Sequence, residues 1–188
     1  NVIIQKDATF NVNLLGNMTV NNNLDFNSVG SSKIITNNFD VKLGSAATVT
    51  GPDADEYVAT TGTGMMEKAV TANATFLFPV GDAVEYSPIS SNYSGSGYAA
   101  ANIRVKANDL THPNKPADAT EYISRYWDVN ATGITGYSNT LTGTYVPADL
   151  TLGVGGTAAQ VKGAVYDGTE WSYAGASSGT NTATGTTT

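Results

Sequence analysis

Apolar and polar residues alternate at every second position along much of the first fifty residues of the chain. Successive side chains of a β-strand point to opposite faces, so this alternation indicates strands with one buried face. No part of the sequence places apolar residues at the ~3.6-residue spacing of an amphipathic helix. The pattern therefore predicts an all-β protein. Its apolar members are Phe10, Val12, Leu14, Met18, Val20, Leu24 and Phe26.

A longer period is superimposed on this alternation. The segment 22–26 recurs as 37–41, and the same shift takes Thr19 to Ile34 and Ile34 to Val49. Short strands repeated at a fixed spacing are typical of a β-solenoid, in which Asn side chains at the corners stack amide on amide. An antiparallel meander with hairpins of similar length is the alternative. We predict a short β-solenoid-like (or meander) segment over residues 1–56.

Turn residues and short apolar strands then follow one another to the end of the chain. Gly51 to Glu56 is rich in turn residues, and later turn signals recur about every 8–12 residues, as in β-sandwiches. We predict an Ig-like antiparallel β-sandwich over 57–175, with 121–129 as a central strand and 110–119 as a surface loop. The Thr- and Gly-rich end, 176–188, is predicted to be a linker or the start of another module.

The composition excludes several classes of function. Only 13% of the residues are charged, with 16 acidic against 9 basic side chains and a net charge of −7, so a nucleic-acid partner is not expected. The chain has no cysteine, which excludes disulfides, cysteine-based zinc sites and thiol nucleophiles. No apolar run approaches the ~20 residues that span a bilayer, so membrane insertion is not expected.

Catalytic constellations are not indicated either. The one histidine, His112, lies between Thr111 and Pro113 and is predicted to be an exposed loop residue, and the chain has no Gly-x-Ser-x-Gly motif. Glu121 and Asp128 are an odd number of positions apart on one predicted strand, so they would face opposite sides rather than pair as in a glycosidase. We therefore expect no enzymatic activity.

Three acidic residues at the junction of the two predicted regions are candidate metal ligands. Asp53, Asp55 and Glu56 offer closely spaced carboxylate oxygens, the ligands that Ca²⁺ prefers, although the rest of an EF-hand loop is missing. A solvated acidic turn is the alternative interpretation. The pairs 82/85 and 167/170 are weaker versions and are interpreted as turn residues. A structural calcium ion at the junction is the only cofactor that the sequence suggests.

Aromatic residues are the remaining feature with binding potential. Exposed rings can stack on sugars, and the candidates for such a site are Trp171, Tyr173, Tyr93 and Tyr98. The alternative is that most aromatic side chains fill the core, as we predict for Tyr126, Trp127, Tyr145 and Tyr166. We also predict that the guanidinium of Arg125 lies over the indole of Trp127, because both residues share a strand face.

Several short phrases of the sequence form a characteristic set when taken in order. They are Tyr57-Val58 with Gly62-Thr63-Gly64, Phe78-Pro79-Val80-Gly81, Tyr86-Ser87-Pro88-Ile89, Arg125-Tyr126-Trp127-Asp128-Val129, Thr144-Tyr145-Val146 with Asp149, and Trp171. Together they resemble modules of large secreted surface proteins of the Bacteroidetes that the type IX secretion system exports, and the resemblance covers about residues 10–175. It implies an extracellular or cell-surface location, adhesin-like or scaffold roles that include gliding, and a β-helical stretch ahead of a β-sandwich.

These observations favour a structural or adhesive module without catalysis, as part of the stalk of an adhesin or an extracellular filament. Its expected partners are neighbouring modules of the same chain or filament, and possible further partners are surface glycans. The alternative is a carbohydrate-binding module of a secreted multidomain protein. A hydrolase domain is the third and weakest interpretation. We expect the chain to be a piece of a longer secreted protein.

Overall fold

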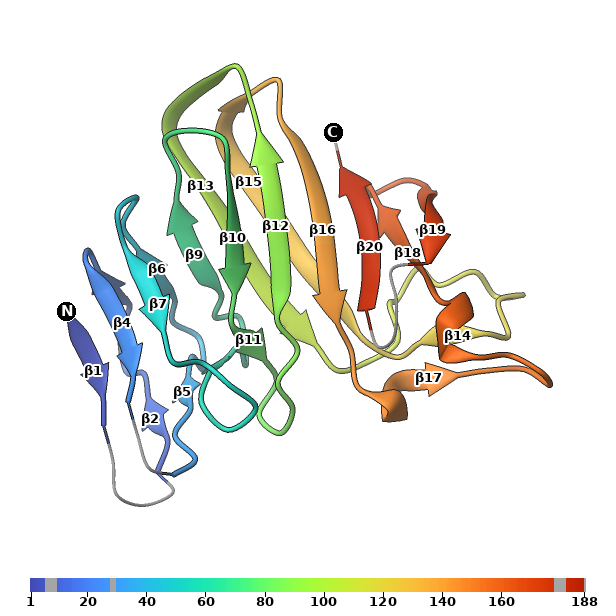
Figure 1. The fold of residues 1–188 in the computed structure, drawn as a ribbon, viewed down its shortest axis with the longest axis horizontal. Coiled ribbons are helices and arrows are strands. Elements are labelled where there is room, and N and C mark those ends of the chain that lie inside the picture. The colour runs from blue at the N-terminus through green and yellow to red at the C-terminus, as the bar shows by residue number, and fades with distance from the viewer. Residues whose placement is uncertain (6–9, 28–29, 178–181, 188) are drawn as a thin grey trace.

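The computed structural model describes residues 1–5, 10–27, 30–177 and 182–187, with side chains described as far as residue 173. Strands account for 49% of the residues and helix for 4%, so the prediction of an all-β protein is confirmed. In Figure 1 the N-terminal strands form a stack of coils at one side, and long antiparallel strands follow them. Among the described residues, no helix is long and apolar enough to cross a membrane.

The N-terminal strands form a β-solenoid in which each coil contributes one strand to each of three parallel sheets. The sheets are β1-β4-β7, β2-β5-β8 and β3-β6-β9. Because all these pairs are parallel, the meander alternative is wrong. The strands are β1 (Val2–Ile4), β2 (Val12–Asn13), β3 (Met18–Val20), β4 (Asn23–Phe26), β5 (Ile34–Ile35), β6 (Val41–Leu43), β7 (Thr48–Thr50), β8 (Val58–Ala59) and β9 (Met66–Ala69).

The coil length differs from the predicted repeat. Val12 lies beside Ile34 and Ile34 lies beside Val58, so a coil is longer than the shift that takes Thr19 to Ile34. The predicted shift is wrong as a stacking period, because Thr19, Ile34 and Val49 belong to three different sheets. That shift advances the chain by two of the three strands in a coil. The longer repeat thus reflects the spacing of strands along the chain and not the length of a coil.

Polar side chains at the corners join one coil to the next. We predicted amide-on-amide stacking, but the corner oxygens instead accept hydrogen bonds from backbone N–H groups of the following coil. Asn17 Oδ1 accepts from the N–H of Asp40 at 2.9 Å, and Asp40 Oδ1 accepts from the N–H of Met65 at 3.0 Å. Such bonds satisfy the backbone groups that a tight corner leaves without a sheet partner.

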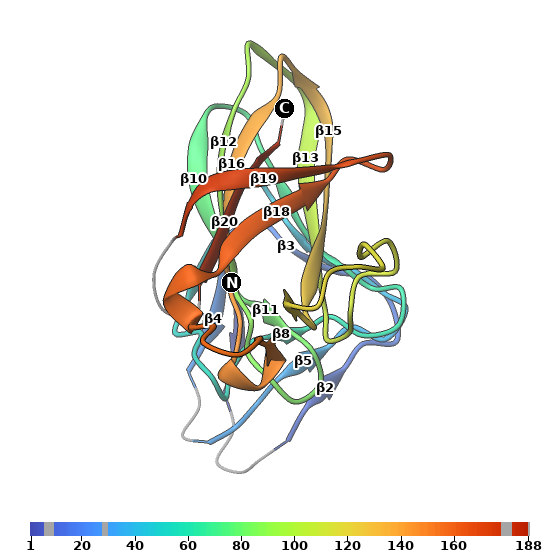
Figure 2. The ribbon, with the colours of Figure 1, turned by 90° about the vertical axis from the view of Figure 1, so that its right-hand side faces the viewer.

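The solenoid leads directly into two facing layers of antiparallel strands. Strands β13 (Gly97–Asn108) and β15 (Tyr126–Thr135) extend the third solenoid sheet beyond β9. The opposite layer has the order β10-β12-β16-β20, and Figure 2 shows the two layers face to face. The strands of this opposite layer are β10 (Ala74–Phe78), β12 (Ile89–Ser94), β16 (Ser138–Thr144) and β20 (Thr182–Thr187).

One apolar core runs through the solenoid and between the layers. Leu24 and Ile34 of the coils belong to the same buried cluster as Ile103 of β13 and Leu141 of β16. The layers approach closely where the ring of Trp127 covers Gly143, at which an added Cβ would lie 2.6 Å from the ring. A glycine is therefore required beneath this indole. The predicted core role of Trp127 is confirmed in part, because its side chain is half-buried against the cluster.

Pairing between strands continues across both of the boundaries that we predicted, after residue 56 and after residue 175. β8 and β9 continue the solenoid sheets past residue 56, and β11 (Val80–Gly81) adds a further parallel strand beside β8. Part of the predicted linker, 182–187, is strand β20 and pairs with β16; residues 178–181 and 188 lie outside the described residues. β15, which the prediction made central, lies at the edge of its sheet.

Two small two-stranded sheets complete the fold beside the layers. β14 (Tyr122–Ile123) pairs with β17 (Leu150–Thr151), and β18 (Lys162–Tyr166) pairs with β19 (Trp171–Ser177). Two short 3-10 helices, η1 (Pro147–Asp149) and η2 (Ala158–Gln160), lie on the path between these strands.

Candidate functional site

The predicted calcium ligands form a self-contained turn. Asp53 Oδ1 accepts hydrogen bonds from the N–H groups of Asp55 at 2.8 Å and Glu56 at 2.9 Å, and the N–H of Asp53 donates to the carbonyl of Glu56 at 2.9 Å. Asp55 is exposed and Glu56 is buried. Within the described part of the chain, these three carboxylates do not gather within the reach of one ion.

The same turn occurs at two other places, and the interpretation of both pairs as turn residues is confirmed. Asp82 Oδ1 accepts from the N–H groups of Val84 and Glu85, and Asp167 Oδ1 from those of Thr169 and Glu170. An aromatic residue follows each turn, which gives the motif Asp-x-x-Glu-aromatic. The copies are 53–57, 82–86 and 167–171, and a further segment, 118–122, matches in sequence.

The aromatic residues of two copies of this motif contact each other. The copy 53–57 directly precedes β8 and the copy 82–86 directly follows β11, the parallel neighbour of β8, and the ring of Tyr57 packs against that of Tyr86 with 5.3 Å between the ring centroids. Burial, followed by the charge of Asp53, raises the pKa of Tyr86 to about 12. Burial also raises the pKa of Tyr57. Both tyrosines thus remain neutral over the physiological range and act as packing groups.

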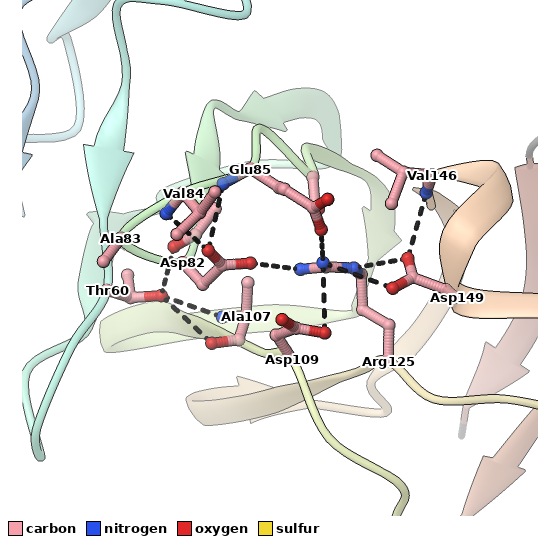
Figure 3. Close-up of polar contacts among 12 residues, drawn as sticks. Thr60, Asp82, Ala83, Val84, Glu85, Ala107, Asp109, Arg125, Val146 and Asp149 are labelled. Carbon is pink, nitrogen blue, oxygen red and sulfur yellow. Dashed lines mark hydrogen bonds and ion pairs between the residues drawn. The ribbon is translucent and has the colours of Figure 1, made fainter.

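A single buried arginine collects four carboxylates where the solenoid meets the layers (Figure 3). The Arg125 side chain is 0% exposed, and its Nη1 lies 2.7 Å from Asp82 Oδ2. Its Nε lies 2.7 Å from Asp149 Oδ2, and Nη2 lies 3.3 Å from Asp109 Oδ1 and also contacts Glu85 Oε2. We call these five residues the Arg125 cluster.

The members of the Arg125 cluster come from segments far apart in sequence. Asp82 and Glu85 belong to the turn after β11, the last parallel strand. Asp109 directly follows β13, and Arg125 directly precedes β15. Asp149 ends η1, where its Oδ2 also accepts from the N–H of Val146 at 3.0 Å. The guanidinium therefore ties the end of the solenoid to both antiparallel layers.

The charges of the Arg125 cluster do not balance, because one cation faces four acids. Burial pushes the pKa of Asp82 upward, but hydrogen bonds from Arg125 and two backbone N–H groups outweigh it, so this pKa lies below its ordinary value. For Glu85, burial together with the charges of Asp149, Asp82 and Asp109 outweighs the attraction of Arg125 and raises the pKa. The arginine thus stabilises Asp82 as an anion more strongly than Glu85.

The arrangement suits a structural joint better than a reactive centre. Asp82, Glu85 and Asp109 each place one oxygen within 4.8 Å of the others, so these residues could hold a cation. The guanidinium of Arg125 already contacts each of them, however, and supplies the positive charge that a metal ion would bring. The sequence alone indicates only turn residues at 82 and 85 and does not reveal the cluster.

The structure separates the predicted sugar-binding residues. Tyr93 is 4% exposed within the core, and Tyr98 donates its hydroxyl to Asn73 Oδ1 at 2.7 Å. Trp171 and Tyr173 lie close together on β19, and Tyr173 is 69% exposed. The ring partners of Trp171 in the described structure are His112 and Tyr166, and neither Tyr93 nor Tyr98 is among them. The four residues therefore do not form one platform, and Tyr93 has no face open to a ligand.

An aromatic cluster encloses the histidine that we predicted to be exposed. His112 is half-buried, with its ring centroid 4.8 Å from Tyr126, 5.3 Å from Tyr166 and 4.9 Å from Trp171. The indole N–H of Trp171 donates to the carbonyl of Asn114 at 2.8 Å. These contacts dock the β18–β19 hairpin on the 110–119 loop. Tyr126 and Tyr166, which we expected in the main core, pack against His112 in this cluster instead.

One predicted side-chain contact is wrong and one core position is confirmed. Arg125 does not stack on Trp127, because the guanidinium is enclosed by carboxylates and the indole N–H donates to the carbonyl of Ser87 at 2.8 Å. Arg125 lies ahead of β15, which begins at Tyr126, so the strand alternation on which the stacking prediction rested does not extend to it. Tyr145 is buried as predicted.

No protein-family model, curated protein or solved structure matches this chain.

Proposed function

We propose that this chain is a structural module of a large secreted bacterial surface protein, placed in an adhesin stalk or an extracellular filament and without catalysis. The sequence phrases that resemble type IX secretion cargo of the Bacteroidetes support this proposal. In the fold, Phe78-Pro79-Val80-Gly81 ends β10 and forms β11, and Arg125 to Val129 contains the central cation and the start of β15. Gliding is one setting in which such a module serves.

The Arg125 cluster is the observation that carries the proposed structural role. Its guanidinium is 0% exposed and is held by four carboxylates from three segments of the chain. A guanidinium enclosed in this way is shielded from a substrate, and removing it would leave buried carboxylates without their cation, which is strongly destabilising. Buried ion pairs that join distant segments of the chain support a structural role, such as spacing or bearing tension, more than they support catalysis.

The location can be tested on intact cells of the source organism. An antibody raised against the chain should label intact cells, and external protease should remove the label while a cytoplasmic marker protein survives. Labelling that requires cell lysis would overturn the surface location. Under this proposal the same purified chain should show no turnover of glycoside or ester substrates.

Carbohydrate binding is the second candidate, and one observation favours it. Tyr173 is 69% exposed and lies on the same face of β19 as Trp171. A glycan array tests this candidate with Tyr173→Ala as the variant and Tyr93→Phe as the matched control, since Tyr93 is buried. Binding that only Tyr173→Ala abolishes would favour a sugar-binding module, and an array without any bound glycan would eliminate it.

We further propose that the antiparallel layers are an Ig-like β-sandwich. The four-stranded order β10-β12-β16-β20 facing β9-β13-β15 supports this assignment, since two antiparallel sheets over one core define the architecture. In the proposed setting its partners are neighbouring modules, with surface glycans as additional ligands under the second candidate.

A further inference from the structure

We propose that the open end of the solenoid, formed by β1, β2 and β3, is an interaction surface that receives one further parallel β-coil. The inference rests on the proposed function for the source of this coil, which is a neighbouring module. Its physical basis, however, is the geometry of the first coil alone.

The first coil presents strand edges in all three solenoid sheets. β1, β2 and β3 are each the last strand in the order of their sheet, and in the described residues each pairs on one side only. An edge strand exposes backbone N–H and C=O groups that can pair with another chain. The opposite end of the stack has no such triple edge in the described structure, because its third sheet continues into β13 and β15.

Three inward-facing residues of the first coil, one on each strand, are less buried than their register partners in the second, whereas Ile4, Leu14 and Val20 are buried. Val2, Val12 and Met18 are half-buried. Their register partners in the second coil, Leu24, Ile34 and Val41, are each 0% exposed. The second coil is covered on both sides, so a coil stacked on β1–β3 would bury these positions in the same way and stabilise the end through the hydrophobic effect.

Large apolar side chains are also exposed at this end of the solenoid. Leu15, just before β3, is 90% exposed, and Ile3 of β1 is 56% exposed. Exposed apolar side chains beside open strand edges are typical of interaction sites. The first coil thus combines unpaired backbone edges with apolar surface.

The corner hydrogen bonds specify which chemistry the partner coil needs. Asn17 Oδ1 binds the N–H of Asp40 in the second coil, and Asp40 Oδ1 binds the N–H of Met65 in the third. A coil stacked on the first should therefore carry Asn or Asp just before its third strand, to accept from the N–H of Asn17. It should also place one apolar residue inward on each of its three strands.

A second copy of this chain fits the open end less well than a parallel coil. A two-fold dimer places the same surface on both partners, so β1–β3 would meet strands that run in the opposite direction. Every pair within the three solenoid sheets is parallel, and the corner hydrogen bonds run from one coil to the next in a single direction. The geometry therefore favours a parallel coil over self-association.

The chain contains a coil with which the proposal can be tested. Asn23 lies beside Thr48 and Val2 beside Leu24, so Asn1 occupies the place in its coil that Thr48 occupies after residue 47. A copy of residues 23–47 fused directly ahead of Asn1 would thus enter β1 in register. The matched control carries Leu24→Asn, Ile34→Asn and Val41→Asn in the added copy only.

Amide hydrogen exchange of residues 1–20 in both fusions is the measurement. The proposal predicts that exchange in β1–β3 slows by about tenfold or more in the fusion and not in the control. Equal exchange in the two proteins would overturn it. Dimers of the unfused chain with protected β1–β3, seen by sedimentation and exchange together, would also overturn it and assign the surface to a second copy. The surface-labelling test is independent, so either idea can fail alone.

Discussion

At the scale of single residues, Arg125 is the side chain on which most other groups depend. It is enclosed by Asp82, Glu85, Asp109 and Asp149, whereas Arg104 pairs with Asp40 and Glu67 while its side chain stays 35% exposed. The two arginines therefore form a natural comparison between a buried and a partly solvated ion pair.

We expect Arg125→Met to lower the free energy of unfolding by about 3–5 kcal/mol, because it leaves buried carboxylates without their cation. The matched change Arg104→Met should cost only about 0–1 kcal/mol, since solvent screens that pair. Urea unfolding at neutral pH measures both values. Equal losses in the two variants would contradict the role that we give to Arg125.

The carboxylates around Arg125 should differ in their dependence on pH. The folded-state pKa of Asp82 is lowered from 3.8, so its ionised form stabilises the fold above that pH, and this stability is lost as the pH falls through the lowered value. The pKa of Glu85 is raised from 4.5, so its contribution is present below pH 4.5 and is lost as the pH rises through the raised value.

At pH 7, Asp82→Asn should therefore cost about 1–3 kcal/mol. Glu85→Gln should stay within about 0.5 kcal/mol of the wild type, because it removes a carboxylate that the cluster does not favour as an anion. The cost of Asp82→Asn should shrink at about pH 3, because this pH lies below 3.8 and the carboxyl of the unfolded wild type is then mostly protonated. Urea unfolding at both pH values provides the comparison, and a Glu85→Gln variant as damaged as Asp82→Asn at pH 7 would refute it.

At the scale of elements, the Asp-x-x-Glu turns give the acidic residues of the predicted calcium site a structural role. In the copies 53–57, 82–86 and 167–171 the first carboxylate accepts hydrogen bonds from backbone N–H groups of its own turn. We expect the same melting temperature in calcium chloride and in EDTA, because that oxygen is engaged. A rise with calcium that Asp55→Asn abolishes, and that Asp167→Asn leaves unchanged, would restore the metal site.

The stacking of the coils can be tested with engineered disulfides, since the chain has no cysteine of its own. Thr19 and Lys42 are register partners in adjacent parallel strands, which lie about 5 Å apart and within disulfide range. The double variant Thr19→Cys with Lys42→Cys should oxidise within one chain. Mass spectrometry without reductant counts the remaining thiols.

The control pair, Asn27→Cys with Lys42→Cys, has the separation of the predicted repeat. It should keep both thiols under the same conditions, because the two positions belong to different faces of the solenoid. A disulfide in the control pair together with free thiols in the Thr19 and Lys42 pair would show that the coil period is wrong.

Local sequence patterns predict the strands of this protein better than the partners of those strands. The alternation of apolar residues such as Leu24 and Phe26 depends only on local backbone geometry, so the strands and the solenoid-like class are predictable from it. The coil length depends on corner hydrogen bonds such as that between Asn17 and Asp40, which join successive coils and leave no local pattern. Periodicity therefore identifies strands but does not set the coil length.

At the scale of the whole molecule, the Arg125 cluster was hidden because its members are far apart along the chain. A sequence signal existed in the repeated Asp-x-x-Glu-aromatic motif, which predicts the same local turn at 82–86 as at 53–57. It cannot reveal that Arg125 and Asp149, which come much later in the chain, fold back onto the turn at Asp82. The separation of Tyr93 and Tyr98 from Trp171 and Tyr173 was hidden for the same reason, since the exposure of a ring is decided by tertiary packing.

The central claim is that solenoid and layers form one mechanical body joined at Arg125. Native-state hydrogen exchange in increasing urea tests it most directly, by following core amides near Leu24 and Ile34 beside those near Ile103 and Leu141. We predict a common midpoint for both groups in the wild type and separate midpoints in Arg125→Met. Separate midpoints in the wild type would contradict the claim, because the solenoid and the layers would then unfold independently.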